Sequence, residues 1–269
     1  MVVFAGQGDA RRSMALLWRT EEPGESRPGP KPGLSVDLIV DAAIAVADAE
    51  GMAALSMRKV GERLGRTGMA LYTYVPSKGE LVDLMYDKAL GELPTAHDLA
   101  GGWRAAVTAW AGHLWHFYQR HPWVLQVSQA RPVLGPNEFA LLESLVAILR
   151  ETGLRPPALR GVVSLLFDFV RGAARTVAES RQAPSATGVS DEEWWHTRSQ
   201  LLEEVAPGFP ARFPMVAWIE SEGSVPGEGE PYLEHQVNEA FTVGLTVLLD
   251  GVQAAVERTG PHAGPVSAP

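Results

Sequence analysis

Apolar residues recur at intervals of three and four along almost the whole chain, which is the spacing that places side chains on one face of an α-helix. Between residues 34 and 93 four such segments follow one another, separated by glycine, proline or a residue that can cap a helix. The alternation of apolar and polar residues that is typical of a strand is absent from the sequence. The pattern predicts an all-α protein.

Two short helical segments lie in the middle of this region. The segment MRKVGERL follows Ser56, the segment GMALYTYV follows Thr67, and Gly65 breaks the pattern between them. A serine or threonine hydroxyl can accept a hydrogen bond from the first turn of a helix, so both residues are expected to be caps. Two short helices joined by a glycine-containing turn are typical of a helix-turn-helix unit, whose second helix can lie in the major groove of DNA.

Local amino-acid composition also divides the chain into segments. Residues 1–33 end in PGESRPGPKPG and are expected to form a flexible, disordered arm, because proline prevents regular helix. Residues 181–230 carry many carboxylates with proline and glycine, which predicts a variable acidic loop that holds a short helix around Trp194 and Trp195. A last long helix is predicted over residues 231–258, followed by a disordered tail at 259–269.

Charge changes the picture only when it is counted locally. The chain has 23 Lys and Arg against 32 Asp and Glu, a formal net charge of −9, which argues against a wholly basic nucleic-acid coat. Between residues 56 and 78, however, five cations face one carboxylate, Glu62. A small helical hairpin with a solvated basic face would give the same pattern, so periodicity and charge alone leave that alternative open.

Several classes of site are disfavoured by composition. The chain has no cysteine, which excludes disulfides and thiolate chemistry and fits a reducing cytoplasm. We find no apolar run approaching the roughly 20 residues of a membrane span, and the first residues lack the order of a signal peptide. Glycine-rich phosphate loops after a strand and the GxSxG and HExxH signatures are also lacking. We therefore expect a cytoplasmic protein with no membrane partner, no cofactor and no enzymatic activity.

Residues 34–93 resemble the N-terminal DNA-binding domain of the TetR family of transcriptional repressors. The resemblance rests on AEGMAALSMRKV, on LG, on ALYTYVPSKGEL and on the apolar run that follows. It implies a three-helix helix-turn-helix domain at 34–93 joined to a helical ligand-binding and dimerisation domain at 94–258. It further implies a homodimer that binds an operator palindrome in double-stranded DNA through a recognition helix at 67–74 and releases it when a small molecule binds.

The resemblance also assigns roles to single residues. Base-facing positions fall on Arg58, Gly68, Met69, Ala70 and Thr73, and phosphate contacts fall on Ser56, Thr67, Tyr72, Tyr74 and Lys78. Two positions depart from the family pattern: Arg66 stands where the turn usually has an apolar residue, so its side chain must point outward or find a partner. Gly68 lowers helix propensity, and we expect it to permit close approach to the DNA backbone or to a thymine methyl.

The C-terminal region resembles, more weakly, the domain found in tetracycline-type repressors. This resemblance implies a four-helix dimer interface made by residues 157–180 and 231–258, with Gly244 and Gly251 allowing close approach. The apolar stripe expected at the interface is Phe241, Leu245, Leu248, Leu249 and Val252. Burial of the same stripe in the core of one chain is the alternative.

A ligand pocket needs apolar walls with a few polar groups. The helix at 103–120 places large side chains near one face, and residues further along the chain could close the cavity. The predicted lining is Trp103, Trp110, His113, Leu114, Phe117, Val127, Arg131, Phe139, Val163 and Phe167. His113 and His116 lack a third ligand, so we expect no metal site. Val127 stands near the position of the family's magnesium-bearing histidine, which argues against a tetracycline-magnesium ligand.

The sequence thus predicts a ligand-responsive dimeric regulator, most simply a repressor, released from its operator by a small hydrophobic or amphipathic effector. The alternatives are a helical ligand-binding or scaffold protein that has lost specific DNA binding, and an enzyme that uses the helical cavity. Binding to DNA distinguishes the first of these from the regulator.

Overall fold

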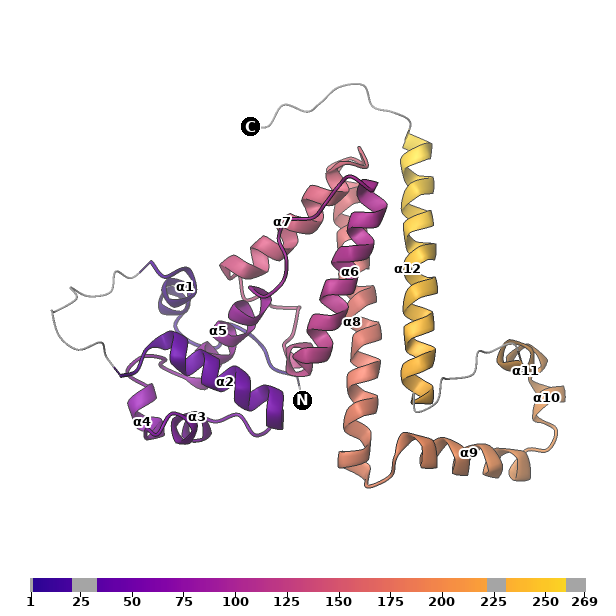
Figure 1. The fold of residues 1–269 in the computed structure, drawn as a ribbon, viewed down its shortest axis with the longest axis horizontal. Helices are drawn as coiled ribbons and strands as arrows, with labels where there is room; N and C mark the ends of the chain where they lie inside the picture. Colours follow the sequence, from indigo (N-terminus) through magenta and orange to yellow (C-terminus); the bar gives the residue numbers. More distant parts are fainter. Residues whose placement is uncertain (1, 21–32, 222–230, 260–269) are drawn as a thin grey trace. The chain divides into compact units, whose positions relative to one another are not determined.

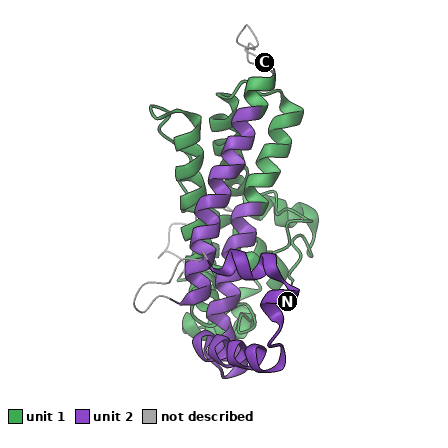
Figure 2. Ribbon diagram, turned by 90° about the vertical axis from the view of Figure 1, so that its right-hand side faces the viewer, with its two compact units in different colours: residues 1–168, 255–269 green, residues 169–254 purple. Residues whose placement is uncertain are grey.

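The computed structural model describes residues 2–20, 33–221 and 231–259 of the 269-residue chain. Regular structure within these ranges is helical, and one isolated bridge joins Val3 to Val127 (Figure 1). The predicted all-α class is therefore confirmed. The model also falls into two compact units, residues 1–168 with 255–269 and residues 169–254, which are described separately below (Figure 2).

Four helices follow the first gap in the described chain: α2 (Val36–Glu50), α3 (Met57–Arg63), α4 (Gly68–Leu71) and α5 (Lys78–Leu90). Serines begin three of them, since the hydroxyls of Ser35, Ser56 and Ser77 each accept the backbone N–H of the residue three positions on. Apolar residues from all four helices are fully buried together with their flanking turns. α3 packs on α4, and α2 packs on both α3 and α5, as a helix-turn-helix domain requires.

The N-terminal residues are ordered as far as Thr20, so the predicted disordered arm is wrong for residues 2–20. They contain a helix, α1 (Ala10–Trp18), which Asp9 caps by accepting the backbone N–H of Arg12. α1 packs on α5 and buries Leu17 there. Proline and glycine concentrate after residue 22, and the sequence prediction extended their effect to the preceding residues, which contain a regular apolar spacing. Residues 21–32 lie outside the described ranges.

The first unit continues with α6 (Gly102–Arg120), the short η1 (Pro122–Gln126), α7 (Pro136–Arg150) and the beginning of α8 (Pro156–Thr187). α6 packs on α7, and α5 also packs on α7. The largest fully buried side chains of α6 are Trp110, Leu114 and Phe117. α5 thus connects the predicted 34–93 domain to α7 within the first compact unit.

The second unit is built on an antiparallel pair, the distal part of α8 and α12 (Tyr232–Thr259). The rings of Phe169 and Phe241 stack 5.6 Å apart, and Arg181 donates two hydrogen bonds of 2.8 Å to Glu234. Residue numbers rise along one helix as they fall along the other, which fixes the antiparallel direction. Gly244 is required here, because a Cβ at that position would lie 2.8 Å from the Phe169 ring.

The acidic stretch at 181–230 is more helical than predicted. α8 continues to Thr187, and α9 (Asp191–Val205), α10 (Phe209–Arg212) and α11 (Pro214–Ser221) follow. The helix expected around Trp194 and Trp195 is confirmed as α9. Its first turn carries three carboxylates, which are favourable at a helix N-terminus. Residues 222–230 and the predicted tail from 260 onward are outside the described ranges.

One helix in the described residues, α12, is long and apolar enough to cross a membrane by length and composition alone. The sequence analysis overlooked it because charged residues interrupt its apolar run. One such helix is weak evidence for a membrane span, because the core helix of a soluble protein passes the same test, although little of α12 is buried.

Candidate nucleic-acid interface

The turn between α3 and α4 is held by a close approach of backbone to backbone. The N–H of Arg66 donates a 2.8 Å hydrogen bond to the carbonyl of Gly61 in α3, and Gly65 adopts φ +64°. A Cβ on Gly61 would lie 2.8 Å from the Arg66 carbonyl oxygen and 2.9 Å from the Gly68 nitrogen. Only glycine at 61 lets the turn rest on α3, a role that the sequence analysis missed.

Gly68, at the start of α4, also touches α3. A Cβ there would lie 3.1 Å from both the nitrogen and the Cα of Arg58, which is tighter than ordinary contact. This contact gives Gly68 a reason within the protein, the seating of α4 on α3. The prediction that it serves approach to DNA therefore has a competing explanation. Arg66, the other departure from the family pattern, was expected either to point outward or to find a partner. It is exposed and points outward.

The face of α4 away from the domain core is strongly exposed. Leu71 is buried, whereas Met69 is 76% exposed and Tyr72 is 43% exposed. Thr73 is exposed, and Ala70 and Tyr74 are half-buried. A helix that enters a DNA groove must expose side chains that can contact the bases. Met69 and Tyr72 meet this requirement, because Gly61 and Gly68 let α4 pack on α3 and leave these side chains open to solvent.

Cations flank this face. The side chain of Arg58 is 79% exposed and forms an i,i+4 ion pair of 2.5 Å with Glu62, and Lys78 is exposed at the start of α5. The Lys59 ammonium pairs with Glu50 at 2.6 Å. An exposed pair such as Arg58 with Glu62 is worth only about 0.3–0.5 kcal/mol, so exchange of the carboxylate for a DNA acceptor is cheap.

The two predicted caps behave differently. The Ser56 hydroxyl accepts the backbone N–H of Lys59 at 3.2 Å, so it is engaged inside the protein. Thr67 has the extended backbone of a cap residue, but its hydroxyl makes no capping hydrogen bond and is exposed. The predicted side-chain cap at Thr67 is therefore wrong, because α4 has four residues and its turn is held by the backbone.

Two carboxylates tie this domain to the helices that follow it. Asp48 of α2 accepts hydrogen bonds from the His121 ring at 2.7 Å and from the Trp123 indole at 2.8 Å. Asp87 of α5 accepts the backbone N–H groups of Asn137 and Glu138 at 2.9 and 3.0 Å and so caps α7 from outside. Burial raises the pKa of Asp87, and these hydrogen bonds oppose that effect.

The residues predicted to bind a ligand separate into two groups. In the first, on α6 and α8, Trp110 is buried and meets the Phe167 ring edge-on at 5.0 Å, with Leu114, Phe117 and Val163 also buried. Trp103 is half-buried, and His113 is exposed with its ring 6.0 Å from that of His97. Burial lowers the pKa of His97, and the nearby His113 contributes to the same effect.

The second group contacts the N-terminal residues instead. Val127 is buried beside Val3, the Arg131 guanidinium lies 5.9 Å from the centre of the Phe4 ring, and Phe139 packs against Trp18 at 6.2 Å. These three were expected to close a ligand cavity, and the structure does not bring them to the face of Trp110. The residues that these three contact lie in the N-terminal segment that was predicted to be a disordered arm.

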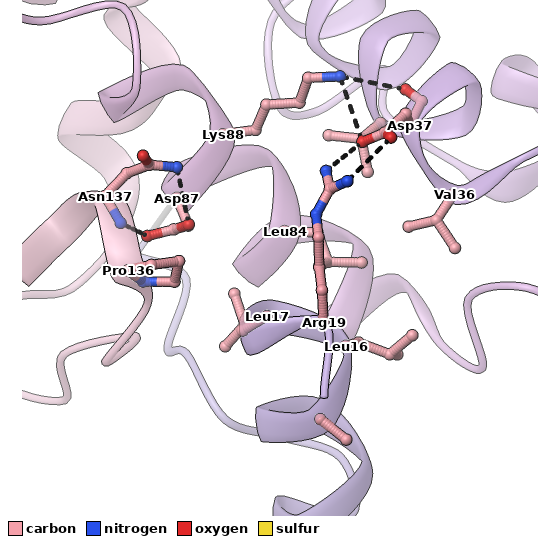
Figure 3. A pocket seen from close by; sticks show the side chains of 12 residues that line it. Leu16, Leu17, Arg19, Val36, Asp37, Leu84, Asp87, Lys88, Pro136 and Asn137 are labelled. Carbon is pink, nitrogen blue, oxygen red and sulfur yellow. Dashed lines mark hydrogen bonds and ion pairs between the residues drawn. The ribbon is translucent and has the colours of Figure 1, made fainter. Parts of the chain in front are cut away.

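A pocket of about 350 Å³ lies between α1, α2, α5 and α7 (Figure 3). Its walls include Leu17, Val40 and Leu84, and the Arg19 guanidinium crosses it to reach Asp37. None of the predicted ligand-binding residues lines it. The sequence could not indicate this pocket because one of its walls is α1.

In this helical protein a turn that depends on glycine holds a short, exposed helix, and cationic side chains flank that helix. These are the features of a helix-turn-helix DNA-binding protein. Residues 39–85 match the family described as "Bacterial regulatory proteins, tetR family", and residues 94–256 match "Tetracyclin repressor-like, C-terminal domain". The chain belongs to the TetR family of transcriptional regulators. Since that family consists of regulators, the prediction that the chain is not an enzyme is confirmed by family membership.

Related proteins agree over nearly the whole length. The chain is 39% identical over 262 residues to the HTH-type transcriptional repressor DrrR1 of Streptomyces coeruleorubidus, covering 96% of this chain and 92% of the relative. An HTH-type transcriptional regulator of Saccharopolyspora erythraea is 29% identical over 89% of this chain and 92% of its own.

Solved structures share the fold. ActR of Streptomyces coelicolor in complex with actinorhodin is 26% identical, with a TM-score of 0.60, covering 85% of this chain and 99% of ActR. BioQ bound to its double-stranded DNA operator is 19% identical with a TM-score of 0.52, covering 82% of this chain and 99% of BioQ, and shows likeness of fold alone.

Proposed function

We propose that the chain is a cytoplasmic, homodimeric repressor that binds a palindromic operator and is released from it by a small hydrophobic or amphipathic effector. The observation that carries the DNA-binding part is the exposed face of α4, with Met69 and Tyr72 open to solvent beside Arg58 and Lys78. The repressor DrrR1, a relative along almost the full chain, supports repression as the outcome.

Within the proposed complex, α4 lies in the major groove. Arg58 reads a base edge from the start of α3, together with Gly68, Met69 and Ala70 of α4 and Thr73 just after it. The phosphate contacts fall to the polar groups around them, Ser56, Thr67, Tyr72, Tyr74 and Lys78. Ser56 would contribute through its backbone or through its hydroxyl's remaining capacity, because that oxygen already accepts a hydrogen bond from Lys59.

The test is binding of the purified full chain to its own upstream DNA, measured by fluorescence anisotropy over a range of salt concentrations. We expect Arg58→Ala and Tyr72→Ala each to weaken specific binding about tenfold or more, since one good base or phosphate contact contributes about 1–3 kcal/mol. Arg150→Ala, which removes an exposed cation from the end of α7, is the matched control and should leave affinity unchanged. Equal, weak binding to all DNA would contradict the proposal and favour a ligand-binding or scaffold protein.

The effector site is proposed at the face of α6 that carries Trp110. The indole Nε1 of Trp110 and the ring Nε2 of His97 are buried and have no hydrogen-bond partner among the described residues. Buried polar groups are normally satisfied, so a ligand that offers oxygen acceptors on an apolar body would suit this face. ActR, which is related and was solved with actinorhodin, supports a small-molecule effector.

Trp110→Phe tests this site, because it removes the N–H and keeps most of the buried ring. We expect a compound that dissociates the operator complex of the unmodified protein to be less effective against Trp110→Phe while operator affinity without the compound is unchanged. A compound that acts equally on both proteins would place the effector elsewhere.

The proposed dimer uses α12, but through a different set of residues from the predicted stripe. Leu245, Leu249 and Val252 are buried within one chain, so they belong to its core, as the sequence analysis allowed as an alternative. Phe241 stacks on Phe169 of the same chain, and Leu248 is half-buried. Burial of these residues leaves another face of the helix for a partner.

Val243 and Val247 stand one turn apart and are 63% and 62% exposed. A Cβ on Gly251 would meet nothing within 4 Å, which leaves room for a second helix. We expect Val247→Asp to convert the dimer to monomer in size-exclusion chromatography with light scattering, and Leu99→Asp, at an exposed apolar position outside the helices of the proposed interface, to serve as the comparison. A dimer that persists in Val247→Asp would place the interface elsewhere.

A further inference from the structure

We propose that residues 2–20, the N-terminal strap, are a positioning element for operator binding: they tie α5, the helix that follows the recognition helix, to residues 126–139 of the C-terminal region. The inference rests on the proposed DNA binding and adds to it a mechanical link that the family resemblance does not assign. All the contacts that carry it lie within the first compact unit.

The strap is joined to the C-terminal region at three points. Val3 donates its N–H to the Gln126 carbonyl at 2.9 Å and accepts the N–H of Ser128 at 2.7 Å, which forms a short bridge. Phe4 lies beneath the Arg131 guanidinium. At the other end of the strap, the Trp18 indole donates a 3.0 Å hydrogen bond to the carbonyl of Leu134.

The strap is joined to the DNA-binding domain as well. The N–H of Gly6 donates to Asp83 of α5 at 3.0 Å, and a Cβ on Gly8 would overlap the carboxylate of Glu80, also on α5. Arg19 donates two hydrogen bonds, of 2.5 and 3.2 Å, to Asp37 of α2. Residues 6 to 19 therefore contact α5, which follows the recognition helix, and α2, which packs on α3.

The contact between the strap and Leu134 restrains a backbone conformation that a leucine does not otherwise favour. The φ of Leu134 is +62°, a left-handed value that is uncommon for a leucine. Its N–H donates to Glu138 at 2.6 Å and its carbonyl accepts from Trp18, so the peptide groups on both sides are held. Such a conformation persists only where the surroundings fix it, and the hydrogen bond from Trp18 is one of the contacts that do so.

Restraint of α5 matters for DNA because α4 leads into α5 across the turn capped by Ser77. A recognition helix held on a restrained support loses less conformational freedom when it binds, which increases affinity. A change in residues 126–139 would also reach α5 through the strap. We therefore expect the docked strap to favour operator binding.

The experiment uses the full chain and its own upstream DNA, with Trp18→Ala as the main variant. Trp18 is 44% exposed, so its removal is expected to leave the fold intact. Arg12→Ala, an exposed residue on the same helix, is the matched control. We expect Trp18→Ala to weaken operator binding about tenfold and Arg12→Ala to change it by less than about twofold. Hydrogen exchange across residues 78–90 should be faster in Trp18→Ala alone.

A second comparison tests transmission. Phe139→Ala alters the C-terminal partner of Trp18, and we expect it to weaken operator binding in the unmodified chain but to add little in the Trp18→Ala chain, because the link is already broken. Unchanged operator affinity in Trp18→Ala, or additive effects of the two substitutions, would overturn the inference and leave the proposed function standing. If the unmodified chain binds no DNA specifically, the proposed function fails. In that case, equal rates of hydrogen exchange across α5 in the unmodified chain and in Trp18→Ala would show that the strap does not restrain α5.

Discussion

The seating of α4 on α3 leads to a sharp prediction for Gly61. Its substitution by alanine places a methyl group 2.8 Å from the Arg66 carbonyl oxygen, 2.9 Å from the Gly68 nitrogen and 3.0 Å from the Thr67 carbonyl carbon. All three atoms belong to the backbone of the turn, so no side chain can rotate away. The turn and α4 must move away from α3 as a body, or α3 must bend.

Two effects of opposite sign set the magnitude. Alanine is favoured over glycine inside a helix by about 1 kcal/mol. Overpacking a tightly fitted site costs about 1–3 kcal/mol, and contact with backbone belongs to the upper part of that range. We expect Gly61→Ala to lower the free energy of unfolding by about 1–2 kcal/mol, and operator affinity to fall about tenfold or more because the recognition helix is displaced.

The matched control is Gly112→Ala in α6. A Cβ at Gly112 meets nothing within 4 Å, so the helix-propensity gain of up to about 1 kcal/mol should appear without a penalty. Urea unfolding followed by circular dichroism, at equal protein concentration because a dimer's stability depends on it, gives both values. Anisotropy with operator DNA gives the affinity. If Gly61→Ala were as stable and as active as Gly112→Ala, the contact between the turn and α3 would not constrain this protein.

Three further predictions concern the rest of the molecule. Burial raises the pKa of Asp83 to about 6 from an ordinary 3.8, with the nearby Glu80 adding to the shift and the Gly6 N–H opposing it. Its contribution to stability is therefore complete below pH 3.8 and is lost as the pH rises through about 6, by up to about 3 kcal/mol. Asp83→Asn should therefore flatten the decline in urea midpoint between about pH 4 and about pH 7. Asp87→Ala leaves the N–H groups of Asn137 and Glu138 without their acceptor and should lower stability by about 2–3 kcal/mol in the same assay, whereas Asp98→Ala, at an exposed loop position, should change it little. Trp110→Ala removes a side chain that is 1% exposed and should cost about 3–5 kcal/mol, and a loss below about 1 kcal/mol would mean that Trp110 does not contribute to the core of the folded chain.

Periodicity and serine caps were sufficient to predict the helices between residues 34 and 93 from the sequence. Ser35, Ser56 and Ser77 cap helices in the structure, and the face of α4 that carries Met69 and Tyr72 is exposed. These features depend on residues close together in the chain. The spacing alone fits either a DNA-binding unit or a helical hairpin with a solvated basic face. The resemblance to the TetR family favours the DNA-binding unit.

Features that depend on distant residues could not be predicted in this way. Asp87 caps a helix that begins 49 positions later, at Pro136, and nothing near Asp87 in the sequence marks it as a cap. Gly135 must be glycine because a Cβ there would overlap the Asp87 carboxylate, which again involves a partner far along the chain. The stripe of α12 was assigned to a partner molecule for the same reason, since periodicity shows that a face is apolar and is silent on what covers it.

The strap connects these observations. Val127, Arg131 and Phe139 were selected as effector contacts because they are apolar or cationic and lie in the region where the family binds ligands, and each of them instead touches a residue of the strap. Residues 126–139 thus contact the strap, and the strap's other contacts are on α2 and α5. If the effector acts on residues 126–139, the strap offers a route to the recognition helix that does not require α6 to move. The Phe139→Ala and Trp18→Ala pair distinguishes that route from coupling through Asp48 and Asp87, because those carboxylates remain in place in both variants.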